Sequence, residues 1–295
     1  MSFDSIPPFR PRPPLAAAAD GVAQAMSLLY GGTAVFTLLR IRQFLNAPDT
    51  SPDRIETLLW PVAWVRLWPF GATGLFVALT AVGLYAGFSW RRRSVRIGVA
   101  VLYLMQAAYL SSFGKVNHND HMLVWTLILL AVPSTAAVDR RTARDRRDLI
   151  VAFWRAQCLV CLFYFLAGLW KLIAGCVQFV VGEPNLFRLD AMPRHLAARL
   201  LQTHGESSVA DWLIAHPTVA TPLLWGAVAI ELLSIVVPFR PRLHRVWGVL
   251  LIGLHLGIGL AMTIWFDATF LVITVLLVLS PLRPATDGAK ANDSA

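Results

Sequence analysis

Charged side chains are scarce in this chain of 295 residues. Asp, Glu, Lys and Arg make up 15% of it, against about 25% in soluble domains. Hydrophobic residues make up 57%, and the mean hydropathy is +0.60. These values exclude an ordinary soluble protein. They predict an all-α, polytopic membrane protein, a bundle of transmembrane helices.

Cysteine is scarce too, and three residues (Cys158, Cys161 and Cys176) exclude a disulfide framework. Cys158 and Cys161 form a C-x-x-C string, but the string lies within an apolar helix. A redox motif needs a reactive thiolate and access to partners, and burial in hydrocarbon disfavours the thiolate. We therefore interpret both as core cysteines.

The ends of the chain are its polar parts. Residues 1–20 are rich in proline and lack the apolar core of a signal peptide. We expect a proline-rich cytoplasmic tail over 1–20, one transmembrane domain over 21–283, and a second cytoplasmic tail over 284–295.

Apolar segments of the transmembrane domain predict about eight membrane-spanning helices, since a span needs about 20 apolar residues. They run near 21–39, 71–89, 97–113, 121–137, 149–175, 218–238, 245–264 and 267–282.

Arginine predominates among the basic residues and predicts the orientation of these helices. With both termini cytoplasmic, sixteen of the 26 basic residues lie in inside segments and eight in outside segments, which leaves Arg155 and Lys171 within the bilayer. The basic charge therefore indicates orientation in a lipid bilayer and no nucleic-acid partner. Arginine-rich usage without targeting signals favours a multi-pass protein of the bacterial inner (plasma) membrane.

A polar stripe marks the fifth predicted helix. Gln157, Tyr164 and Lys171 recur every seven residues, which is two helical turns with a drift of only about 20°. Gly168 lies beside them and would let another helix or a flat ligand approach closely. An ammonium in hydrocarbon costs roughly 2.5–3.5 kcal/mol, so Lys171 should have a partner and a task.

Three interpretations of the stripe stay open. Gln157 and Tyr164 can serve helix packing through interhelical hydrogen bonds. Lys171 can extend its amine to the nearby membrane surface. An amine in an apolar pocket can also act as a base, because burial disfavours its charged form.

Two further charges lie at matching predicted depths. Arg155 follows the cytoplasmic start of the fifth helix, and Glu231 precedes the cytoplasmic end of the sixth. At a rise of about 1.5 Å per residue the two side chains should meet. We predict a structural ion pair that offsets both charges.

Further polar residues cluster before the fourth helix. The string from Asn117 to His121 contains His118 and Asp120, at a predicted height that matches Lys171. His118, Asp120 and His121 are three donors that permit a metal, but their spacing matches no zinc or iron signature. We therefore assign no metal site. His255, midway along the seventh helix, can exchange a proton near neutral pH or serve as a hydrogen-bonded packing residue.

Together these residues resemble one known family. The run from Gln157 through Tyr164 to Lys171, the string before the fourth helix, and Leu254-His255-Leu resemble the vitamin K-dependent gamma-carboxylase. The chain is similar to the wider HTTM (horizontally transferred transmembrane domain) family from about residue 20 to 283.

The resemblance implies a reaction centre. In the carboxylase, the lysine that matches Lys171 deprotonates a reduced quinone, vitamin K. By resemblance Lys171 would be the base, and His255 and His118 would complete the catalytic residues. The pocket for a quinone-like lipid would be lined by Gln157, Tyr164, Gly168, Asn117, Asp120 and His121.

Two functions fit this pattern. The first is a membrane enzyme with carboxylase-like, quinone-linked lyase chemistry, whose substrate and reduced-quinone cofactor enter from the bilayer. The second is a non-catalytic membrane partner, an assembly or immunity factor for a separate soluble or secreted protein or peptide. Solute transport is weaker, because the sequence has no inverted repeat.

Overall fold

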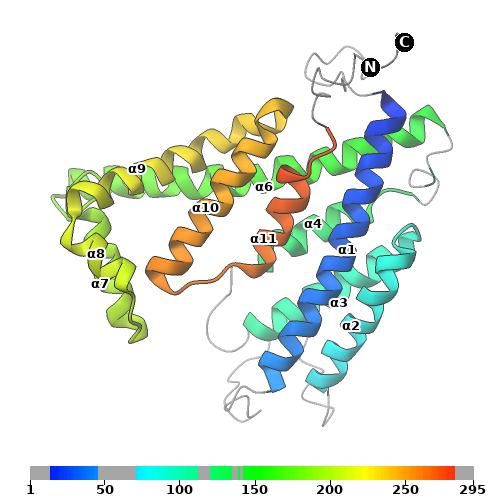
Figure 1. Cartoon of the computed structure of the whole chain (residues 1–295), viewed down its shortest axis with the longest axis horizontal. Helices are drawn as coiled ribbons and strands as arrows, with labels where there is room; N and C mark the ends of the chain where they lie inside the picture. The colour runs from blue at the N-terminus through cyan, green and yellow to red at the C-terminus, as the bar shows by residue number, and fades with distance from the viewer. Residues whose placement is uncertain (1–13, 46–70, 112–119, 135–138, 140–141, 283–295) are drawn as a thin grey trace, which may run out of the picture. The chain divides into compact units, whose positions relative to one another are not determined.

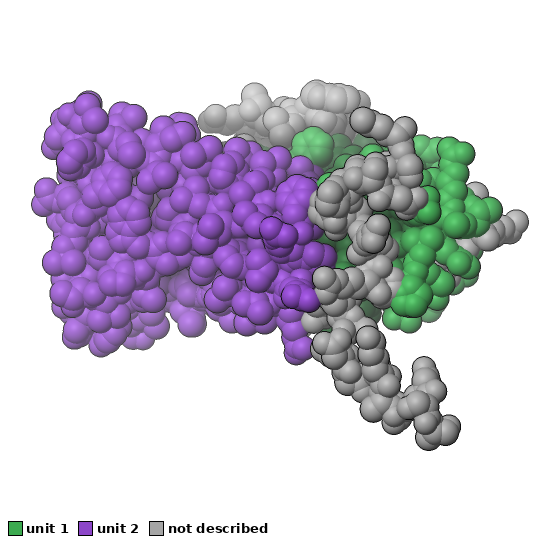
Figure 2. Space-filling model, turned by 90° about the horizontal axis from the view of Figure 1, so that it is seen from above, with its two compact units in different colours: residues 1–157, 267–295 green, residues 158–266 purple. Residues whose placement is uncertain are grey.

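The computed structural model describes residues 14–45, 71–111, 120–134, 139 and 142–282. Regular secondary structure within these ranges is entirely helical (Figure 1), as the composition predicts. The chain divides into two compact units, residues 1–157 with 267–295 and residues 158–266 (Figure 2). The first boundary falls inside a helix, where no change of composition marks it. The single transmembrane domain over 21–283 stays a prediction.

Five described helices are long and apolar enough to cross a membrane: Leu15–Arg40, Arg93–Ser111, Ala143–Val180, Pro217–Phe239 and Pro241–Met262. They are compatible with a membrane protein. Three shorter apolar helices, Thr73–Ser89, His121–Ala131 and Asp267–Val278, match the other predicted spans. The total of eight spans and the cytoplasmic termini therefore stay predictions.

The first unit is built from helices that pack in chain order, α1 on α2, α2 on α3 and α3 on α4, with α11 against α1 and α4. Their bounds are α1 (Leu15–Leu45), α2 (Gly71–Ser89), α3 (Arg93–Ser111), α4 (His121–Ala131) and α11 (Asp267–Ile273), which continues as the π-helix η8 (Thr274–Val278).

Helix α1 begins at Leu15, ahead of the predicted start at 21, and its glycines serve close packing. A Cβ at Gly21 would lie 2.5 Å from Cβ of Pro281, and one at Gly32 would lie 2.6 Å from Cδ1 of Leu271. Gly31 has no neighbour within 4 Å of that position. Gly21 and Gly32 thus let Pro281 and Leu271 pack closely against α1.

A buried arginine closes the turn between α2 and α3. The side chain of Arg96 is fully buried. Its Nη1 donates to the carbonyls of Trp90 at 2.9 Å and Arg91 at 2.8 Å, and its Nη2 donates to the carbonyl of Pro133. The guanidinium therefore satisfies carbonyls of the turn and of the segment after α4, where the sequence predicts only a basic loop.

The second unit contains the rest of α6 (Ala143–Val180), which is longer than the predicted 149–175. The other elements are α7 (Ala191–Thr203), α8 (Ser208–Ala215), α9 (Pro217–Leu233), the 3₁₀-helices η6 (Ser234–Phe239) and η7 (Pro241–Leu243), and α10 (His244–Met262).

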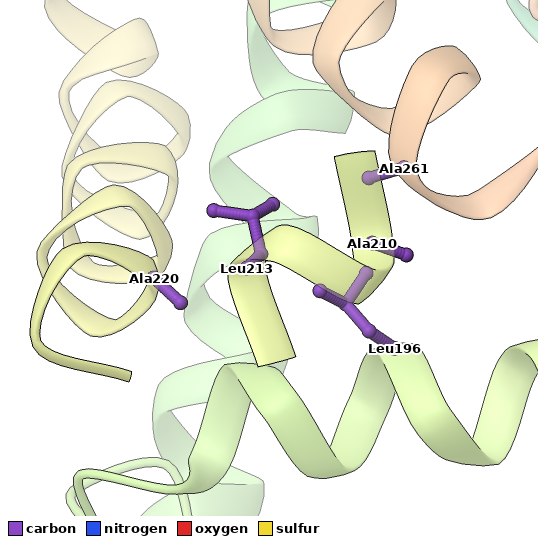
Figure 3. Packing of buried hydrophobic residues seen from close by; sticks show 5 residues of the cluster. All are labelled: Leu196, Ala210, Leu213, Ala220 and Ala261. Atoms are coloured by element: carbon purple, nitrogen blue, oxygen red, sulfur yellow. The ribbon is translucent and has the colours of Figure 1, made fainter. Parts of the chain in front are cut away.

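The segment between the predicted helices 149–175 and 218–238 is itself folded. Leu196, Ala210 and Leu213 of α7 and α8 form a buried apolar cluster with Ala220 of α9 and Ala261 of α10 (Figure 3). Ser207 caps α8, because its Oγ accepts from the backbone N–H of Ala210 at 3.1 Å. The same hydroxyl donates to the carbonyl of Leu260 at 2.7 Å, so it also joins α8 to α10.

The two α1 glycines Gly21 and Gly31 make a matched pair for testing this packing. Gly21→Ala should lower the free energy of unfolding by about 1–3 kcal/mol, because the rigid ring of Pro281 cannot move aside easily. Gly31→Ala should be neutral or stabilising by up to about 1 kcal/mol, since alanine favours a helix. Thermal unfolding in detergent measures both, and equal effects would contradict the packing of Pro281 on α1.

Candidate functional site

The polar stripe of α6 makes hydrogen bonds to other segments at each of its three positions. Gln157 bonds residues of the C-terminal segment, Tyr164 bonds α10, and Lys171 bonds α9. Gln157 belongs to the first unit, and the other two residues belong to the second. These bonds are the interhelical kind that the packing interpretation expects.

Lys171 forms an ion pair with Glu231 of α9. Its Nζ donates to Oε2 of Glu231 at 2.6 Å, and it also donates to Oε1. The Glu231 side chain is 6% exposed, whereas the Lys171 side chain is 43% exposed. The carboxylate is therefore held in the protein, while the Lys171 side chain stays partly accessible.

Gly168 makes this pair possible. A Cβ at that position would lie 2.8 Å from Cβ of Glu231 and 3.0 Å from the backbone nitrogen of Leu232. The absence of a side chain lets α9 approach α6 one turn before Lys171. The close neighbour of Gly168 is thus a helix, one of the two occupants that the sequence allows.

The structure gives Glu231 a different partner from the predicted Arg155, which is exposed. Depth along the helices was the basis for that prediction, and it assumed a fifth helix over 149–175. Helix α6 instead continues to Val180, and α9 ends at Leu233. Glu231 therefore lies beside the later turns of α6, where Lys171 is.

Tyr164 and His255 form a second polar contact in the same unit. The Tyr164 hydroxyl and Nε2 of His255 share a hydrogen bond of 2.6 Å, and both side chains are buried. The ring of Phe266 lies 4.6 Å from the imidazole, centroid to centroid. Lys171 is within electrostatic range of His255, and Glu231 is within range of Tyr164. The four residues form one polar cluster between α6, α9 and α10.

Gln157 has a structural task that the sequence leaves undecided. Its Nε2 donates to the carbonyl of Leu276 at 2.6 Å and to Oγ of Ser280 at 2.9 Å. Leu276 lies in the π-helix η8. In a π-helix each carbonyl accepts a hydrogen bond from the backbone N–H five residues later. For Leu276 that residue is Pro281, which has no N–H. Gln157 supplies the missing donor.

The polar string before α4 is described from Asp120 onward. Asp120 is buried, and its Oδ1 accepts from Nη1 of Arg40 at 2.6 Å and from the Tyr103 hydroxyl at 2.9 Å. Its Oδ2 has no hydrogen-bond partner among the described residues. His121 is the partly buried first residue of α4. Asn117 and His118 lie outside the described residues, so their predicted roles stay predictions.

Sequence reasoning missed the contribution of Arg40 and Tyr103. The first predicted span, 21–39, leaves Arg40 outside the helix, yet α1 continues through it to Leu45. Tyr103 lies on the buried face of α3. One signal in the sequence could have indicated this network. Asp120 is the acidic residue of its string, and Arg40 is a basic residue at a similar predicted height.

Within the described ranges, no group of three or more His, Cys, Asp or Glu side chains is arranged to hold a metal ion.

A pocket of about 320 Å³ lies at the start of α7, lined by Arg188, Leu189, Asp190 and Pro217. Asp190 accepts from Nε of Arg188 at 3.0 Å and from Nε of Arg194 at 2.6 Å. The hydrogen bond from Arg188 and the positive charges beside it lower the pKa of Asp190. These ion pairs therefore persist at neutral pH and are lost when the pH falls through that lowered pKa.

Comparisons with protein-family models, with curated proteins and with solved structures each gave no match.

Gln157→Met tests the assignment of a structural role to the amide. The variant should lower the free energy of unfolding by about 1–3 kcal/mol, because the buried carbonyl of Leu276 loses its donor. Gln178→Met, on the same helix and only partly buried, is the control and should stay close to wild type. Chemical unfolding in detergent measures both, and two indistinguishable variants would refute the assignment.

A double-mutant cycle tests the ion pair. Lys171→Met should destabilise, because it leaves the carboxylate of Glu231 buried without its cation. The loss should lie between about 1 kcal/mol, the value for exposed pairs, and about 3–5 kcal/mol, the value for fully buried ones. The double variant Lys171→Met/Glu231→Leu should recover stability relative to Lys171→Met.

The cycle is read from thermal unfolding at fixed detergent and pH. Additive effects of the two substitutions would mean that Lys171 and Glu231 do not interact.

Proposed function

We propose that the protein is a membrane enzyme that removes a proton from a lipophilic, quinol-type substrate, with Lys171 as the base. The observation that carries this proposal is the pairing of the Lys171 amine with Glu231, beside the Tyr164–His255 hydrogen bond. An amine, a carboxylate, a phenol and an imidazole on three apolar helices are groups that exchange protons. The resemblance to the HTTM family agrees with this choice.

The ion pair supplies a base in two proton movements. The Lys171 ammonium first passes a proton to the carboxylate of Glu231, which leaves a neutral amine and a neutral acid. The amine then takes the proton of a substrate hydroxyl and becomes an ammonium beside the new substrate anion. In apolar surroundings the neutral pair is accessible, because desolvation penalises both charged forms.

The chemical character of the residues fits a quinol ring. A quinol supplies the acidic hydroxyl when it is bound. The Lys171 side chain is 43% exposed, and its neighbour Trp170 is 71% exposed, so a hydrophobic molecule can reach the amine from the bilayer. The Tyr164–His255 pair offers a hydrogen bond to a second ring oxygen.

Ligand binding tests the proposal in purified protein. Reduced menaquinone at 100 times its dissociation constant should raise the free energy of unfolding by about 2.7 kcal/mol. Its dimethyl ether, which lacks acidic hydroxyls, should give a smaller increase. Lys171→Met should abolish the difference between the two compounds. Arg155→Met, at an exposed basic residue of the same helix, should preserve it.

Absence of any stabilisation by quinols would contradict the enzyme and favour the second function, a membrane partner for a secreted protein or peptide. That alternative is supported by exposed apolar side chains around α7, including Leu189 and Leu201. Such a partner would tolerate Lys171→Met/Glu231→Leu, which removes the amine without leaving a buried charge, and would fail when residues 183–200 are changed. The two functions therefore respond oppositely to one pair of alterations.

A further inference from the structure

A short segment with two aromatic residues follows α10 and packs onto that helix. The helix ends at Met262, and Thr263 takes a left-handed backbone conformation with a φ of 56°. A β-branched residue adopts this conformation only with strain, which persists where the surrounding structure holds it. Residues 263–266 therefore leave α10 in a direction that other contacts must fix.

Contacts from α8 fix the end of α10. The Ser207 hydroxyl, at the start of α8, donates to the carbonyl of Leu260 at 2.7 Å. Leu260 lies in the last turn of α10, where the helix has no further N–H groups for its carbonyls. The backbone N–H of Thr263 still donates to the carbonyl of Gly259 at 3.0 Å. The point from which residues 263–266 depart is thus held by two helices.

Gly259 lets the Trp265 indole lie directly on α10. A Cβ at position 259 would lie 2.9 Å from Cε3 and from Cζ3 of that indole, so any side chain there would displace the ring. The next residue, Phe266, places its ring 4.6 Å from the His255 imidazole, centroid to centroid, at an interplanar angle of 53°. Positions 259 and 255 are one helical turn apart, so the two aromatic residues contact successive turns of α10.

The Phe266 ring restricts how the imidazole can turn. Nε2 of His255 and the Tyr164 hydroxyl share a hydrogen bond of 2.6 Å. Rotation of a histidine ring about its Cβ–Cγ bond is only weakly restricted by the side chain itself. A tilted aromatic neighbour at this distance narrows that rotation through ring packing. Phe266 therefore supports the orientation in which Nε2 faces Tyr164.

We propose that Phe266 is a positioning residue, which acts through His255, and that Gly259 sets its place through Trp265. The inference rests on the proposed function, in which the Tyr164–His255 pair offers a hydrogen bond to a second ring oxygen of the quinol. A residue that only fills space would affect stability alone. A positioning residue also sets the direction of Nε2, and through it the affinity for the quinol.

Nitrogen-15 labelling of histidine tests the positioning in the full-length protein without substrate. The signal that disappears in His255→Asn belongs to His255, and Tyr164→Phe gives its shift when the hydrogen bond is lost. Phe266→Ala and Gly259→Ala should each move the signal in that direction, whereas Phe266→Tyr, which keeps the ring, should leave it in place. Gly257→Ala is the matched control, because no atom lies within 4 Å of a Cβ at that position.

Reduced menaquinone, titrated during thermal unfolding of the same variants, tests the link to the substrate. Phe266→Ala and Gly259→Ala should weaken its binding about two- to tenfold, which corresponds to one net hydrogen bond. Gly257→Ala should bind it like wild type.

An unchanged His255 signal in both Phe266→Ala and Gly259→Ala would overturn the positioning role, whether or not a quinol binds. A shifted signal with menaquinol affinity equal to that of wild type would also overturn it, because Phe266 would then serve packing alone. Absence of menaquinol binding to the wild-type protein would instead overturn the proposed function, and the histidine signals separate that result from a failure of the positioning.

Discussion

A primary amine and a carboxylate meet between two apolar helices of this protein, and the chemistry that we propose for the second unit depends on that meeting. Lys171 or Glu231 as an isolated charge in an apolar environment would be unfavourable, because removing a charge from water costs several kcal/mol. Their ion pair offsets part of that cost. It is possible because Gly168 lets α9 approach the backbone of α6. The same contact brings both residues into electrostatic range of the Tyr164–His255 hydrogen bond.

The other buried polar groups serve the architecture within each unit. Arg96 and Gln157 donate to backbone carbonyls that helix geometry leaves without partners, at the α2–α3 turn and beside Pro281. Asp120 draws α1 and α3 to the start of α4 through Arg40 and Tyr103. Hydrogen bonding of this kind is required where water cannot satisfy the backbone. The Lys171–Glu231 and Tyr164–His255 contacts join side chains to one another, as the Asp120 network does, whereas Arg96 donates to backbone carbonyls.

Much of the helical organisation could be predicted from the sequence, because long apolar segments have few alternatives. Helix α2 matches its predicted range, 71–89. Their spacing of seven residues correctly placed Gln157, Tyr164 and Lys171 on one side of α6. Which helix each of them faces could not be predicted, since that depends on where helices end and cross. Glu231 received the wrong partner for this reason, and the division inside α6 left no trace in composition.

The scarcity of lysine allows a direct measurement of the central contact. With ¹⁵N-labelled lysine the protein gives three side-chain Nζ signals, from Lys115, Lys171 and Lys290. The signal that disappears in the variant Lys171→Met belongs to Lys171. Replacing Glu231 by Gln should shift the Lys171 signal and leave the other two in place. An unchanged Lys171 signal in Glu231→Gln would contradict the pairing from which the proposed chemistry follows.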